Sequence, residues 1–370
     1  MMSLQIGIVG LPNVGKSTVF NALTKAGAAV ASYPFTTIDP NVGVAEVDDQ
    51  RLNDIAALVG PERVVPTAIQ FVDIAGLVKG ASRGEGLGNQ FLGHIRNVDA
   101  IAMVVRCFRD PDVTHVSTDL DPQADIKTID LELILADLAT VERRMEKAKS
   151  MAKARPKDYE AQLAWLTGLH QHLDAGARAE SHGSVDSRSE IRDLRNELNL
   201  LTAKPRLYVA NVGEEDLPDG GELAAQVAET AAAEETETVV LCALLETELA
   251  EWPPDEAVAY RAELGLRESG LQTLVKAGYR LLNLITFFTT TGGKVVQAWT
   301  LRQGSPALEA AGKVHTDMQR GFIRAEVVSY QDLMAAGSPA VAREKGLLRL
   351  EGRECVVQDG DVIHFRFSPP

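Results

Sequence analysis

The sequence predicts an α/β fold: a main domain with a mostly parallel sheet, a helical hairpin inserted into that domain, and a smaller α+β domain after it. Five short apolar runs have the length of buried strands and alternate with loop or helical segments; they are residues 4–9, 68–72, 100–105, 205–210 and 238–242. Such alternation is typical of a parallel sheet covered by helices. The composition changes near residue 127 and again near residue 284, where we expect the insertion and the second domain to begin.

A chain of 370 residues can form two or three domains. We expect the main domain over residues 1–280, the inserted hairpin over 127–201 and the final domain over 284–367. The insertion is charged and rich in alanine and leucine at helical spacing, whereas the final segment contains short β-like runs. Asp359-Gly360, between two such runs, predicts a turn.

The net charge of −15 is distributed unevenly along the chain. Residues 214–263 contain fifteen acidic residues and one basic residue, Arg261, whereas residues 281–370 contain ten basic and nine acidic residues. The acidic total therefore does not exclude a surface elsewhere that faces RNA.

Several features predict a protein of the cytoplasm that has no membrane contact; we also expect a monomer, although the sequence carries no signal for the oligomeric state. No run of about 18 apolar residues without charge is present, and the N-terminus enters a strand-like segment without a charged leader. Cys107, Cys242 and Cys355 lie far apart, without the spacing of a metal site or a disulfide framework. A reducing compartment fits this cysteine usage.

The first strand and helix are joined by Gly10-Leu-Pro-Asn-Val-Gly15-Lys16-Ser17, which matches the P-loop pattern in its usual place. Glycines in such a loop let backbone N–H groups surround phosphates, and the helix N-terminus adds positive potential. Lys16 can reach the β- and γ-phosphates as a catalytic group, and the Ser17 hydroxyl can bind Mg²⁺. The residues expected to hold the triphosphate are Asn13, Val14, Gly15, Lys16, Ser17 and Thr18.

A second phosphate anchor follows the apolar run at 68–72. In Asp73-Ile-Ala-Gly76, the carboxylate at the strand end can hold magnesium through water, and the Gly76 amide can contact the γ-phosphate during catalysis. Thr37, on the loop between the two anchors, can complete the metal shell, so the expected metal ligands are Ser17, Thr37 and Asp73. A segment that orders with the bound nucleotide is expected at Gly80, Gly84, Gly86 and Gly88.

The base site departs from the Asn-Lys-x-Asp pattern, whose aspartate accepts two hydrogen bonds from guanine. The corresponding strand end is Asn211-Val212-Gly213-Glu214, without the lysine and with glutamate in place of aspartate. Because loss of a paired base contact can change discrimination by orders of magnitude, this pattern favours adenine, with the Val212 backbone as a partner for its amino group. The last base-side loop would consist of Cys242, Ala243 and Leu244.

These motifs resemble those of the YchF or Obg-like ATPase family. The resemblance extends over essentially the whole chain and rests on the P-loop, on Asn-x-x-Glu at 211–214 and on four further strings: 73–82, Gly86-Leu-Gly-Asn-Gln-Phe91, Gly312-Lys-Val-His-Thr-Asp317 and Arg320-Gly-Phe-Ile-Arg324. The Asp-Gly-Asp-Val-Ile ending resembles that of a TGS domain. The resemblance implies a Ras-like core, a coiled-coil insertion, a ubiquitin-like (β-grasp) TGS domain, preference for ATP over GTP, and association with ribosomes.

The residue after Gly76 indicates slow intrinsic hydrolysis. Many GTPases place a water-orienting glutamine there, whereas Leu77 cannot hold water. A partner, a monovalent ion or another side chain would then position the water. His115, in the polar segment 109–125, is one catalytic candidate, and an ordinary loop histidine is at least as simple an interpretation.

Two groups of basic residues could contact RNA or the ribosome. One lies near the expected tip of the hairpin and contains Arg143, Arg144, Lys147, Lys149, Lys153, Arg155 and Lys157. The other lies in the final domain and contains Lys294, Arg302, Arg320 and Arg324. A solvated helix face is the alternative for the first group, and a domain that only braces the nucleotide core is the alternative for the second.

Three functions therefore compete. The first is an ATPase switch whose nucleotide state controls docking to a ribosome or another large partner. The second is a GTPase translation factor of similar architecture, which the 211–214 pattern disfavours. The third is a binding module for which nucleotide is a structural ligand and turnover is incidental, an interpretation that Leu77 supports.

Overall fold

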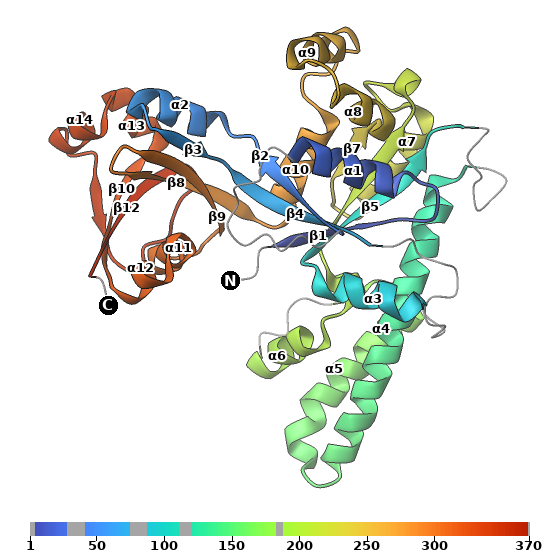
Figure 1. Ribbon diagram of the computed structural model, residues 1–370. Coiled ribbons are helices and arrows are strands. Elements are labelled where there is room, and N and C mark those ends of the chain that lie inside the picture. Colours follow the sequence, from blue (N-terminus) through green and yellow to red (C-terminus); the bar gives the residue numbers. More distant parts are fainter. Residues whose placement is uncertain (1–3, 28–40, 75–86, 111–119, 183–187, 369–370) are drawn as a thin grey trace.

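The computed structural model describes residues 4–27, 41–74, 87–110, 120–182 and 188–368. Two sheets and a helical arm make up the molecule, and the arm projects away from the first sheet (Figure 1). Among the described helices, none combines the length and the apolar character needed to cross a membrane.

The first sheet is six-stranded with the order β2-β4-β1-β5-β6-β7. Its parallel strands are β1 (Gln5–Val9), β4 (Thr67–Asp73), β5 (Ala100–Cys107), β6 (Arg206–Val212) and β7 (Thr238–Leu241). Only β2 (Val42–Val47) is antiparallel to its neighbour, β4. Every residue of β5 and β6 is buried, which explains their nearly continuous apolar sequences. The predicted mostly parallel α/β sheet is confirmed.

Helices contact this sheet along its length. Those of the core are α1 (Lys16–Gly27), α3 (Leu87–Asn97), α7 (Gly221–Ala233), α8 (Ala243–Leu249), α9 (Pro254–Glu263) and α10 (Gly270–Leu281). α1 packs against α8 and α10, whereas α7 packs against β6 and the arm. The loops after β1, β4, β6 and β7 thereby gather at the carboxyl ends of the strands, where α/β sheets bind ligands.

The arm consists of α4 (Pro122–Ala152) packed against α5 (Pro156–Asp174), with α6 (Ser189–Leu198) beside them (Figure 1). Its helix begins at Pro122 rather than near residue 127, because Asp121 caps it by accepting the Ala124 N–H at 2.9 Å. The arm has an apolar core of its own, which includes Ile134, Val141, Leu166 and Leu169. The turn at 153–155 places the basic group near the tip, as predicted.

The second sheet has the order β11-β10-β12-β8-β9-β3. Its strands from the C-terminal part are β8 (Leu284–Thr291), β9 (Val295–Arg302), β10 (Phe322–Ser329), β11 (Arg349–Glu351) and β12 (Asp361–Phe367). Its helices are α11 (Ala307–Val314), α12 (Thr316–Arg320), α13 (Tyr330–Ala336) and α14 (Pro339–Glu344). β8 and β9 form an antiparallel hairpin, and β12 pairs with β8 in parallel. The β-grasp assignment stays a prediction.

The predicted turn at Asp359-Gly360 is present directly before β12, and Gly360 adopts a φ of +87°, which favours glycine. The run before the turn forms no strand; it contributes only an isolated bridge between Val356 and Pro306.

Residues 50–65 of the main domain pack with the second sheet. β3 (Arg63–Val65) pairs with β9, and α2 (Gln50–Val59) buries Leu52 and Ile55 in one apolar cluster with Phe288 of β8. The predicted boundaries, 1–280 and 284–367, did not include this packing of β3 and α2 with the second sheet. A strand of three residues is too short to have a recognisable sequence pattern.

Candidate nucleotide-binding site

The P-loop occupies the sharp turn between β1 and α1. Asn13 and Gly15 adopt positive φ values of 60° and 91°. A Cβ at Gly15 would lie 2.2 Å from the Asn211 amide nitrogen, and a Cβ at Gly10 would lie 2.5 Å from the carbonyl oxygen of Val104. The two glycines of the motif are therefore required by close approach, as the pattern predicts.

Lys16, the first residue of α1, is largely buried, with 8% of its surface exposed. Its ammonium group donates to the carbonyl of Leu11 at 2.7 Å, so the side chain folds back along the loop. Burial lowers the pKa of Lys16, and the nearby Asp73 carboxylate opposes that shift. An anion bound in the loop would favour the charged form further, so this lysine suits a phosphate ligand.

Asp73, the last residue of β4, faces the start of α1. The Ser17 hydroxyl donates to its Oδ2 at 3.4 Å, close to the limit of a hydrogen bond, while its backbone N–H donates to the Asn41 carbonyl at 2.9 Å. Its other carboxylate oxygen, Oδ1, is buried and has no hydrogen-bond partner. A buried carboxylate oxygen without a partner beside a serine hydroxyl fits the oxygen-ligand chemistry of Mg²⁺.

Asn211 connects the P-loop to the base-side loop. Its amide nitrogen donates to the Val14 carbonyl at 3.0 Å, and its amide oxygen accepts the Ala243 N–H at 3.0 Å. The residue is buried at the end of β6. Its side-chain amide therefore acts as a clamp that holds the two loops in position relative to each other. The sequence predicted Asn211 as a nucleotide-binding residue but did not predict this positioning role.

The remaining base-site residues surround the ends of β6 and β7. Val212 is buried, whereas Glu214 begins a short 3₁₀ helix and accepts a hydrogen bond from the Tyr260 hydroxyl. Cys242 precedes α8, and burial raises the pKa of its thiol, although backbone N–H groups of Leu245 and Leu244 oppose that rise. Ala243 is buried, but the Leu244 side chain is exposed.

Thr37, Gly76, Leu77 and His115 lie outside the described residues, as do Gly80, Gly84 and Gly86. Thr18 is half-buried in the first turn of α1. The structure therefore brings together the P-loop, Asp73 and the base-side loops, while the roles of Thr37, Gly76 and His115 stay predictions.

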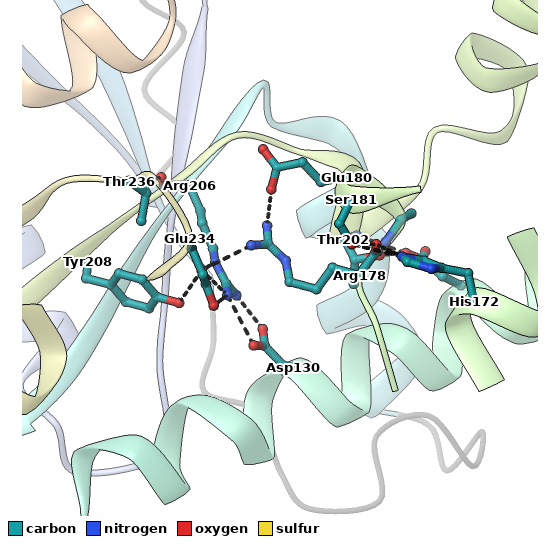
Figure 2. A network of polar contacts seen from close by, with 12 residues as sticks. Asp130, His172, Arg178, Glu180, Ser181, Thr202, Arg206, Tyr208, Glu234 and Thr236 are labelled. Carbon is teal, nitrogen blue, oxygen red and sulfur yellow. Dashed lines mark hydrogen bonds and ion pairs between the residues drawn. The ribbon is translucent and has the colours of Figure 1, made fainter. Parts of the chain in front are cut away.

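Two features were missed by the sequence interpretation. One is Tyr260, which holds Glu214. The other is a polar network at the base of the arm, centred on Arg206 in β6 (Figure 2). Arg206 is 4% exposed and pairs with Asp130 of α4 at 3.1 Å and with Glu234, after α7, at 2.6 Å. The sequence feature that could have indicated this network is the single arginine in the otherwise mostly apolar run 205–210.

Comparisons with known proteins agree with this geometry. Residues 5–137 match the family MMR_HSR1, described as "50S ribosome-binding GTPase", and residues 284–368 match the family YchF-GTPase_C, described as "Protein of unknown function (DUF933)".

Relatives match along nearly the whole chain. A Bacillus subtilis protein named "Ribosome-binding ATPase YchF" is 54% identical over 99% of this chain and 100% of its own length. An Escherichia coli O157:H7 protein of the same name is 48% identical over the same shares. The solved structure of the Schizosaccharomyces pombe YchF GTPase superposes with a TM-score of 0.87 at 34% identity and covers 98% of each chain.

Proposed function

The chain belongs to the YchF family of P-loop nucleotide hydrolases, and from this premise we propose that it is an ATPase that binds and slowly hydrolyses ATP with Mg²⁺. In this proposal the nucleotide state controls association with the ribosome, and the protein works in the cytoplasm, where ribosomes are. The observation that carries the proposal is the presence, in one site, of a buried P-loop lysine and of a buried carboxylate oxygen on Asp73 that has no hydrogen-bond partner.

The phosphate site supports triphosphate chemistry. Lys16 would hold the β- and γ-phosphates, and the backbone N–H groups of 13–18 would surround them. Ser17 and Asp73 would hold Mg²⁺, with Thr37 as the proposed third ligand. The bound ion would supply charge neutralisation on the phosphate oxygens as the terminal group leaves. Because Leu77 stands where a water-orienting glutamine is common, turnover without a partner is proposed to be slow.

Preference for ATP rests on the 211–214 segment. A guanine-reading aspartate is replaced by Glu214, whose carboxylate is engaged by Tyr260, and no lysine is present in the segment to pack on a base. The Val212 backbone is the proposed partner for the adenine amino group. The fungal structure and the N-terminal family carry the word GTPase in their descriptions, so a GTP-dependent ribosome factor is the second candidate.

Ribosome binding is proposed from the names of the bacterial relatives and from the basic group at the arm's tip. The test is co-sedimentation of the purified protein with 70S ribosomes in the presence of ATP, ADP or a non-hydrolysable ATP analogue, with parallel measurement of phosphate release. We expect co-sedimentation to differ between ATP and ADP, and ribosomes to accelerate phosphate release. Equal binding in all three states, with no acceleration, would instead favour a module for which nucleotide is only a structural ligand.

A further inference from the structure

The segment between β7 and α10 exposes an apolar surface. Leu244 is 64% exposed, Trp252 is 42% exposed and Val258 is 64% exposed. Leu244, Glu248 and Trp252 follow one another at intervals of four, and backbone hydrogen bonds from Ala250 and Trp252 continue the helical turn beyond α8. Leu244 and Glu248, four residues apart in α8, share one face of that helix, and Trp252 lies in the turn directly after it; we call these three side chains the stripe.

α9 follows the stripe along the chain, with Ala257 and Tyr260 packed against the core of the main domain. Ala257 is its only buried residue, and the helix projects beyond α8 at the margin of the core (Figure 1). The rings of Trp252 and Tyr260 lie 5.4 Å apart at an interplanar angle of 50°. We call the surface formed by the exposed Leu244, Glu248, Trp252 and Val258 and the half-buried Tyr260 the α8–α9 surface. An exposed apolar patch rimmed by charged residues is typical of a protein interaction site.

Carboxylates converge on the aromatic pair. The Tyr260 hydroxyl donates to Glu214, and this hydrogen bond and the charge of Glu214 are the main causes that raise the pKa of Tyr260, ahead of desolvation and the charges of Glu263 and Glu248. The surface lies within residues 214–263, where acidic residues outnumber basic residues fifteen to one. The apolar side chains are therefore surrounded by negative charge.

We propose that the α8–α9 surface binds a basic protein segment that carries arginine or lysine beside aliphatic side chains. A guanidinium or ammonium group would lie against the Trp252 ring and pair with Glu248, which combines cation–π attraction with a charge-assisted hydrogen bond. Leu244 and Val258 would contact the aliphatic side chains of the partner and exclude water around the contact at Trp252. RNA, whose phosphates carry the same sign of charge as this surface, does not complement it.

This assignment goes beyond ribosome association, because it concerns a different face of the molecule. The basic group at the tip of the arm complements nucleic acid, whereas the α8–α9 surface complements cationic protein. The two surfaces would therefore engage different components of a large partner, or different partners.

The test is fluorescence anisotropy of a labelled short peptide of alternating arginine and leucine, titrated with the full-length protein. Trp252→Ala removes the ring without changing net charge, and Glu248→Lys reverses a charge on the stripe. Matched controls are Leu131→Ala, at an apolar residue 55% exposed on α4, and Glu190→Lys, at an exposed acid on α6. We expect roughly tenfold weaker peptide binding for each α8–α9 variant and less than about twofold weakening for each control.

Equal weakening in test and control variants would show attraction by net charge alone and would overturn the proposal, as would no measurable binding by the unmodified protein. A labelled RNA oligonucleotide is titrated in parallel. Loss of RNA binding in Trp252→Ala would assign the surface to nucleic acid and contradict the proposal. Because both α8–α9 substitutions fall on exposed side chains, we expect thermal unfolding curves close to that of the parent protein.

Discussion

The side-chain amide of Asn211 donates to the backbone carbonyl of Val14 at 3.0 Å, so the end of β6 is hydrogen-bonded directly to the P-loop. The same amide accepts the N–H of Ala243. The phosphate-binding and base-side loops are therefore positioned relative to each other by one buried side chain.

Asn211→Ala should weaken ATP binding by about tenfold or more, because it leaves a buried carbonyl and a buried N–H without partners, at about 1–3 kcal/mol each. Equilibrium binding of a fluorescent ATP analogue measures the effect. Asn53→Ala, at an exposed position of α2, is the matched control and should bind as the parent does. If Asn211→Ala binds ATP normally, the clamp does not organise the site.

Lys16→Ala should lower ATP affinity by roughly ten- to a hundredfold, the range for loss of a hydrogen bond to a charged group. The fold should remain, because removing a buried cation from the loop leaves the sheet core unchanged. The control is Lys25→Ala at the other end of α1, where the side chain is half exposed and pairs with Glu251 at 2.8 Å. Circular dichroism measures whether each variant keeps the fold, and ATP titration measures its affinity for ATP. Unchanged affinity in Lys16→Ala would contradict the P-loop assignment.

Asp73→Asn should remove most of the dependence of ATP binding on Mg²⁺, because a neutral amide would replace the only proposed ligand that carries a negative charge. In the parent protein, chelation of Mg²⁺ with EDTA should weaken ATP binding markedly, whereas the variant should bind ATP weakly with or without Mg²⁺. The exposed Asp48, changed to asparagine, serves as control. If Asp73→Asn keeps the full Mg²⁺ dependence of ATP binding, Asp73 is not a ligand of the metal.

Arg206→Met should destabilise the protein by roughly 3–5 kcal/mol, because the side chains of Asp130 and Glu234, 16% and 24% exposed, would lose their shared cation. Urea unfolding measures the loss of free energy. Arg143→Ala, at an exposed site further along α4, should cost less than about 1 kcal/mol. Similar costs for the two variants would show that the network at the base of the arm contributes little to stability.

Local patterns in the sequence predicted the five parallel strands of the first sheet, the P-loop and Asp73, because each depends on residues close together along the chain. Three features could not be predicted in this way. The Asn211 clamp joins residues 197 positions apart, and the Tyr260–Glu214 contact depends on how α9 folds back. The packing of α2 and β3 on the second sheet depends on side chains from both halves of the chain, including the Arg51–Asp359 ion pair at 2.7 Å. Each is set by tertiary contacts that have no local sequence signal.

Equilibrium competition between fluorescent ATP and GTP analogues and the unlabelled nucleotides, with Mg²⁺ present, tests the central claim most directly. The account predicts clear preference for ATP, since Asn211-Val-Gly-Glu214 lacks the guanine-reading pair of lysine and aspartate. Equal affinity for the two nucleotides, or preference for GTP, would contradict that claim, leave the phosphate site in place, and make a GTP-dependent ribosome factor the better description.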